Sequence, residues 1–224
     1  MRVIFFKNKP DKEYLMPGLI HHLTCAKLVL RNMNEQNWNE TEFYMGNLIP
    51  DMGKDKSKSH YRREPFNGWD VPDLALVKAD CLYKDNALLM GVYCHLYLDY
   101  FYTHFYLGKK YRLEGDKVIQ CKNNVCCCDV KYFRSENGIY GDYSATNERL
   151  IRSGLAPWKE INELSAKLPL TGVAALDDRK ELGWKEEFFG YLSQPSHSFF
   201  QFLNYDEFVE MIQRGAESFL KEIE

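Results

Sequence analysis

The sequence predicts an all-α protein formed by a single domain, residues 1–224. The chain has 224 residues and 45% of them are hydrophobic, which is enough for one sizeable core. Its apolar residues recur mainly at the three- and four-residue spacing of helices, and only the segment 109–140 departs from this pattern. Two small domains would also fit the length, but one helical domain is the simpler arrangement.

Helical periodicity covers most of the chain, and turn residues separate the helical segments. We expect a break near Asp85. We also expect the last helix to pack on the domain, because its polar face is acidic rather than basic. The predicted helices cover residues 18–32, 72–107, 143–153, 157–167, 179–192 and 205–223.

Residues 109–140 favour a small β-hairpin insertion. The stretch YRLEGDKVIQCKNNVCCCDVKYF places two turn signals, Glu-Gly-Asp and Asn-Asn, between runs of β-favouring residues. It also contains Cys121, Cys126, Cys127 and Cys128. Adjacent cysteines cannot easily all face one ion, so we expect a reduced strand or loop rather than a structural metal site.

Five of the six histidines lie in three short segments, together with the candidate ligands Asp51 and Asp99. In MGVYCHLYLDYFYTH, His95 and Asp99 are four residues apart and project from one helical face. Zinc accepts imidazole and carboxylate ligands in catalytic sites, and iron or nickel is also compatible with them. A hydrogen-bonded core pair would explain the two residues equally well. His104 lies about 140° from Asp99 around an ideal helix, so it needs a bend, a helix end or another metal position.

The other two segments add candidate ligands. Asp51 follows Pro50 at the end of an apolar stretch, where its carboxylate either binds a metal or caps a turn. His60 closes a lysine-rich loop nine residues later. His21 and His22 precede an apolar run, and one of them can face a metal while its neighbour faces elsewhere.

In this order the motifs resemble those of the zinc-dependent phospholipase C family, helical metallohydrolases related to bacterial phosphatidylcholine-hydrolysing phospholipase C and to single-strand-specific zinc nucleases. An early histidine opens a helix, and MGNLIPDM is similar to the family's Gly-x-x-x-Pro-Asp step. A histidine follows in SHYR, and MGVYCHLYLDYFYTH is similar to the family's Gly-x-x-x-His-x-x-x-Asp helix with its trailing histidine. The resemblance covers roughly residues 15–107.

The resemblance implies a phospholipase C-like helical fold with a set of zinc ligands. Asp99 would bridge two ions, and His22 rather than His21 would hold the second, because its distance to the following helix fits the family better. His104 would belong to a further metal position. The ligands implied for the first zinc are Asp51, His60, His95 and Asp99.

One part of the family's site is not evident in this sequence. The family also uses a downstream histidine and glutamate one helical turn apart, but no glutamate stands four residues after His197. Asp142 could substitute as an oxygen ligand, although an aspartate at such a position is more often a helix N-cap. We therefore expect two zinc ions, with three as the alternative.

Such a site would hydrolyse a phosphoester with a metal-activated water. Asp51 would be a ligand that also accepts the proton of that water. The substrate would be a phospholipid or another phosphodiester, including a small soluble one, and nucleic acid is not excluded. The alternatives are a metal-binding or sensing protein that keeps the fold without turnover, and a metal-free helical domain.

The charge and hydropathy of the chain indicate which partners it binds and where in the cell it is located. The net charge of −3 and the pI near 6.1 argue against a strongly electrostatic nucleic-acid binder. Basic residues around His60 either attract a phosphorylated substrate or form a solvated loop; they are Lys54, Lys56, Lys58, Arg62 and Arg63. The apolar run in MRVIFFKNKPDKEY is too short for a signal peptide, and no segment matches a membrane helix, so we expect a cytoplasmic protein. The sequence does not indicate an oligomeric state.

Overall fold

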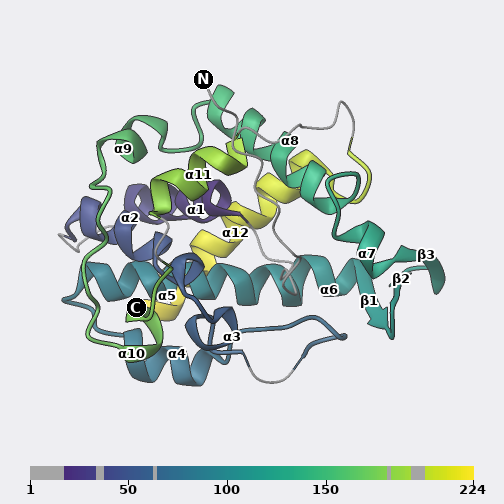
Figure 1. The fold of residues 1–224 in the computed structure, drawn as a ribbon, viewed down its shortest axis with the longest axis horizontal. Coiled ribbons are helices and arrows are strands. Elements are labelled where there is room, and N and C mark those ends of the chain that lie inside the picture. Colours follow the sequence, from purple (N-terminus) through teal and green to yellow (C-terminus); the bar gives the residue numbers. More distant parts are fainter. Residues whose placement is uncertain (1–17, 34–37, 63–64, 181–182, 193–199) are drawn as a thin grey trace.

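A helix that is apolar on nearly every side runs through the middle of the molecule (Figure 1). This helix, α5 (Ala87–Tyr102), buries every residue except Tyr100, as expected for a helix surrounded by other elements. Asn86 caps its start by accepting a hydrogen bond from the backbone N–H of Leu89. The structure is a computed structural model, and it describes residues 18–33, 38–62, 65–180, 183–192 and 200–224.

Helices from both ends of the chain pack around α5 (Figure 1). α12 carries a strongly apolar face that includes Phe208, Ile212 and Phe219, and this face is buried. The predicted packing of the last helix on the domain is therefore confirmed. The helices in contact with α5 are α1 (Leu19–Asn32), α2 (Glu40–Leu48), α4 (Leu74–Cys81) and α12 (Tyr205–Ile223).

The predicted β insertion is confirmed, and it contains three strands rather than two. α5 continues through a π-helical turn, η2 (Thr103–Leu107), and a short helix, α6 (Gly108–Lys110), into an antiparallel sheet. Gly115 and Asn124 have positive φ angles of 63° and 57°, and they make the tight turns where the sequence predicted turns. The strands, in spatial order, are β1 (Tyr111–Glu114), β2 (Lys117–Gln120) and β3 (Val125–Asp129).

Cysteines in the sheet remain reduced thiols. Cys126 and Cys127 are exposed on β3, and every described cysteine is free. Within the described ranges, no cysteine belongs to a group of three ligand-type side chains. The strand expected there is present.

The remaining helices follow the predicted order, with shifted ends. The helix expected over 72–107 is interrupted between Cys81 and Ala87, as expected near Asp85. α2 was not among the predicted helices, because its consecutive buried run from Phe43 to Leu48 shows no helical period. Three four-residue helices were not predicted either: Lys56–Ser59, Val130–Phe133 and Ala174–Asp177. The helices between β3 and α12 are α7 (Val130–Phe133), α8 (Ile139–Arg152), α9 (Trp158–Glu163), α10 (Ala174–Asp177) and α11 (Trp184–Leu192). None of the helices in the described part of the chain is long and apolar enough to cross a membrane.

Two glycines allow α2 and α5 to touch backbone to backbone. A Cβ atom added to Gly46 would lie 2.0 Å from the carbonyl oxygen of Leu88, and one added to Gly91 would lie 2.2 Å from that of Phe43. Real Cβ atoms do not approach so closely, so any larger residue must push the helices apart. This crossing places the end of α2 beside the middle of α5.

We expect Gly91→Ala to destabilise the protein by at least about 2 kcal/mol, because the added methyl group overpacks the helix crossing. The free energy of unfolding, measured by guanidinium titration, tests this. Gly190→Ala is the matched control, because a Cβ there meets nothing within 4 Å. Alanine should stabilise α11 by up to about 1 kcal/mol. Equal effects of the two substitutions would contradict a tight crossing.

Candidate metal centre

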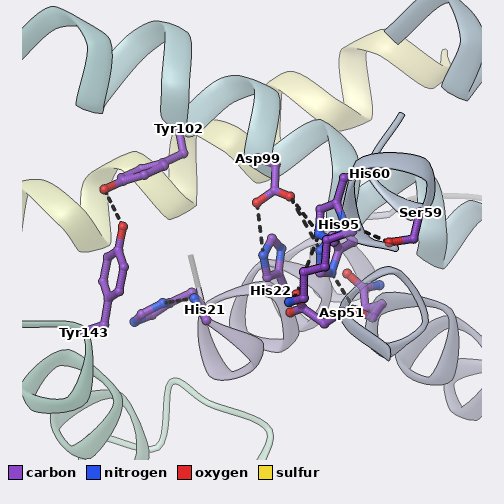
Figure 2. A network of polar contacts seen from close by, with 12 residues as sticks. His21, His22, Asp51, Ser59, His60, His95, Asp99, Tyr102 and Tyr143 are labelled. Carbon is purple, nitrogen blue, oxygen red and sulfur yellow. Dashed lines mark hydrogen bonds and ion pairs between the residues drawn. The ribbon is translucent and has the colours of Figure 1, made fainter. Parts of the chain in front are cut away.

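Five polar side chains converge inside the molecule although they come from four different elements (Figure 2). α5 contributes two of them, and α1 contributes one. The others come from a 3-10 turn, η1 (Pro50–Met52), and from the residue that ends α3 (Lys56–Ser59). The five residues are His22, Asp51, His60, His95 and Asp99, and all are buried.

Asp99 lies at the centre of this cluster, and its two oxygens face different histidines. Its Oδ1 is 3.2 Å from Nε2 of His22. Its Oδ2 is 3.6 Å from Nε2 of His95 and 3.7 Å from Nε2 of His60. Asp51 adds a second carboxylate, with Oδ1 3.6 Å from Nε2 of His60. The side chains therefore form two overlapping sets of possible ligands, with Asp99 between them.

Two groups of three residues, which share His95, also meet a stricter geometric condition. In each group, the ligand atoms all lie within 4.8 Å of one another. One group is His22, Asp51 and His95, and the other is His60, His95 and Asp99. The rings of His22 and His95 stack with centroids 3.5 Å apart and planes 8° apart. Two imidazolium cations would repel each other at that distance.

Hydrogen bonds behind the cluster orient two of the imidazoles. Nδ1 of His95 is 2.7 Å from the carbonyl oxygen of Asn47, which can only accept, so the ring proton is on Nδ1. The Ser59 hydroxyl donates to the carbonyl of Pro50 at 2.8 Å and faces Nδ1 of His60 at 3.0 Å. That hydroxyl is then free to accept the Nδ1 proton of His60. In both rings the lone pair on Nε2 points at the carboxylates, as in histidines that bind metals.

The polar atoms of this cluster lack the hydrogen bonds that burial normally requires. Neither oxygen of Asp99 accepts a hydrogen bond from the described residues, and Nε2 of His60 and of His95 makes none. Burial lowers the pKa of both histidines to about 3, so they are neutral and give Asp99 no compensating charge. A buried carboxylate without donors or a cation is strongly unfavourable. The residues therefore fit a bound divalent cation.

Asp51 stands at the edge of the cluster beside a lysine. Its Oδ1 is 2.7 Å from Nζ of Lys56, and its side chain is 11% exposed. Burial raises the pKa of Asp51, but the Lys56 ammonium and the nearby His60 outweigh this effect and hold the pKa well below its usual range. The side chain caps no helix, because the residue before η1 is Ile49 and that turn has no side-chain cap. Asp51 is therefore an ionised carboxylate that faces the histidines.

The neighbouring histidine on α1 has a different environment. His21 is buried, and its Nδ1 accepts a hydrogen bond from the backbone N–H of Gly18 at 2.8 Å. Its ring packs edge-on against Tyr143 and Phe208. Of the adjacent pair, His22 faces the cluster and His21 faces away (Figure 2).

The structure does not bring His104 into either ligand group. Its Nδ1 is 3.1 Å from the carbonyl oxygen of Tyr100, and its ring lies between Phe66 and Tyr100. The π-helical turn begins at Thr103, so the helical register changes between Asp99 and His104. A turn of this kind does not carry His104 to the face that Asp99 occupies.

Asp142 is neither an N-cap nor a member of the cluster. The N-cap of α8 is Gly138, so the N-cap alternative is wrong. Its carboxylate instead accepts hydrogen bonds from the backbone N–H groups of Gln201, Phe202 and Leu203 at 3.0, 2.7 and 2.9 Å. It holds the segment that leads into α12. His197, the later histidine of the sequence, and Arg63 lie outside the described residues.

Three contacts of the site were not anticipated from the sequence. Lys56 was placed in a basic loop, but its contact with Asp51 depends on how that loop folds. Asn47 contributes its backbone carbonyl, a group that every residue has, so its residue type could not indicate this contact. Ser59 immediately precedes His60, and a serine next to a candidate ligand is the one signal that could have indicated a supporting hydrogen bond.

Comparison with known proteins gives one match. A family model described as zinc dependent phospholipase C matches residues 21–153, more than half of the chain. The matched range contains all five converging side chains. Searches among curated proteins and among solved structures found no match.

The lowered histidine pKa values predict that the metal-free protein loses stability in mild acid. An unfolded histidine binds a proton near pH 6.5, whereas the pKa of His21, His60 and His95 in the folded chain is about 3. Stability is then complete above pH 6.5 and falls towards pH 3, by up to about 1.4 kcal/mol per pH unit for each histidine. The depressed pKa of Asp51 acts only below about pH 4, where unfolded aspartate titrates.

Guanidinium unfolding of chelator-treated protein at pH 7 and pH 5 measures this loss. His60→Gln should show a smaller loss, because one of the three groups is removed. Equal stability at the two pH values would show that these histidines are protonated in the folded protein.

Proposed function

The chain belongs to the zinc-dependent phospholipase C family, and on that premise we propose that it hydrolyses phosphoesters with zinc held by the buried cluster. The observation that supports this most strongly is the environment of Asp99. Its carboxylate has no exposure and no hydrogen-bond donor among the described residues, and three imidazoles surround it. A cation is the partner that such a carboxylate requires.

We propose two ions for this site. Asp99 offers one oxygen to each, because its Oδ1 faces His22 while its Oδ2 faces His60 and His95. The first ion would be held by Asp51, His60, His95 and Asp99, and the second by His22 and Asp99. Histidine and carboxylate ligands without cysteine are typical of catalytic zinc sites that keep a position for water.

Zinc bound there would lower the pKa of a water molecule towards neutrality and would stabilise negative charge on the phosphoryl group. The chain's own residues would supply orientation and proton transfer. The contact of Asn47 with His95 and that of Ser59 with His60 hold the rings with Nε2 towards the carboxylates. Asp51, already ionised and at the exposed edge, would accept the proton of the attacking water.

The proposed substrate is a phospholipid or another phosphodiester. The alternative from another class is a protein that binds metal in the same fold without turnover. The two differ in one measurable property, since both bind metal and only the hydrolase turns over substrate. Metal content and hydrolysis therefore need to be measured separately.

Removal of the central carboxylate should remove the metal. We expect elemental analysis to find about two zinc ions per wild-type chain and less than one in Asp99→Ala, because both proposed positions lose a ligand. Zinc should raise the melting temperature of the wild type but not that of Asp99→Ala. His104→Gln is the control, and its zinc content should equal that of the wild type. Absence of zinc from the wild type would contradict the proposed site.

Asp51→Asn should preserve the fold and reduce turnover. The amide has nearly the same shape but accepts a proton poorly, so we expect a loss of about 10²- to 10⁴-fold in kcat on a phosphodiester such as bis(4-nitrophenyl) phosphate. Circular dichroism and zinc content show whether the variant is otherwise intact. Unchanged kcat in a variant that still binds zinc would exclude Asp51 as the proton acceptor.

A further inference from the structure

Of the three lysines in the loop before His60, one is directed at the cluster. Lys54 pairs with Asp178 at 3.2 Å and Lys58 pairs with Asp55 at 3.4 Å, and both ion pairs are on the surface. Lys56 instead places its Nζ 2.7 Å from Oδ1 of Asp51. Lys56 therefore differs from the other two lysines of its loop, although the sequence gives no sign of the difference.

Lys56 also marks the side from which solvent reaches the cluster. The side chains of His22, His60, His95 and Asp99 have no exposed surface. Asp51 is 11% exposed, and the Lys56 side chain beside it is 26% exposed. A molecule that approaches the buried carboxylates from solvent therefore meets the Lys56–Asp51 pair first.

We propose that Lys56 is a substrate-binding residue whose ammonium group donates a hydrogen bond to a non-bridging oxygen of the phosphoryl group. This inference rests on the proposed function. The part of the substrate that Lys56 would recognise is an ionised phosphoryl oxygen. An ammonium group has three donors, so a contact with Asp51 is compatible with a hydrogen bond to an anion. Its flexible four-carbon stem allows the small movement required.

The position of Lys56 is suited to this role. Asp51 is the proposed proton acceptor, so the attacking water and the phosphorus atom would lie beside it. A cation 2.7 Å from Asp51 is then adjacent to the negative charge that the phosphoryl oxygens carry. The alternative is that Lys56 only holds Asp51 in place, in which case it would not contribute to binding of a free anion.

Inorganic phosphate is the probe that separates the two roles. Isothermal titration calorimetry of the zinc-loaded full chain should show that Lys56→Gln binds phosphate at least about tenfold more weakly than the wild type, as expected for a lost hydrogen bond between charged groups. Lys54→Gln and Lys58→Gln are matched controls from the same loop and should bind phosphate as the wild type does. Lys56→Arg should retain most of the affinity, because it keeps the charge.

Kinetics of bis(4-nitrophenyl) phosphate hydrolysis give a second readout. Lys56→Gln should raise KM, whereas a residue that only positions Asp51 would lower kcat and leave phosphate binding unchanged. Unchanged phosphate affinity in Lys56→Gln, or no phosphate binding by the wild type, would overturn the inference. Phosphate binding that depends on Lys56 in a protein without turnover would support the inference and reject the proposed hydrolase, so the two failures are distinguishable.

Discussion

The close contact between α2 and α5 is the constraint on which the rest of the site depends. Gly46 and Gly91 let the two backbones meet where any side chain would collide. The chain that leaves α2 therefore runs along α5 at short range and delivers Asp51 beside His95. The same approach brings the carbonyl of Asn47 within 2.7 Å of the His95 ring. Both glycines belong to the motifs that contain the candidate ligands, so the motifs combine a packing requirement with a chemical one.

Burial and neighbouring charges determine which side chains of the cluster are charged. Desolvation keeps His60 and His95 neutral, with pKa values of about 3, while Lys56 and His60 help to keep Asp51 ionised. The centre thus contains carboxylates among imidazoles whose lone pairs face inward, which is an environment that attracts a cation and excludes a proton. Supporting contacts with Ser59 and Asn47 fix the rings before any ion is present, and this reduces the reorganisation that binding requires.

Other buried polar groups have structural roles that separate them from the cluster. Asp142 uses its oxygens to hold residues 201–203, and the Tyr102 and Tyr143 hydroxyls lie 2.7 Å apart in a pair of their own. His21 is held by the N–H of Gly18. These contacts position α8 and α12 around α5. The partly exposed pair beside the cluster, Asp51 and Lys56, lies instead in η1 and α3.

Sequence patterns were sufficient to predict the helical class, the β insertion, the break near Asp85 and the three segments that supply the converging side chains. Periodicity and turn residues are local properties, so they can be recognised without knowledge of contacts. They did not reveal α2, because its buried run from Phe43 to Leu48 shows no helical period. The family resemblance already favoured His22 over His21, and His22 is the one that faces Asp99. Sequence patterns did not indicate that His104 and Asp142 lie apart from the cluster, or that Lys56, rather than Lys54 or Lys58, contacts Asp51. Those outcomes depend on helix crossings and on competing hydrogen bonds between residues far apart in the chain. Such contacts cannot be predicted from local sequence patterns.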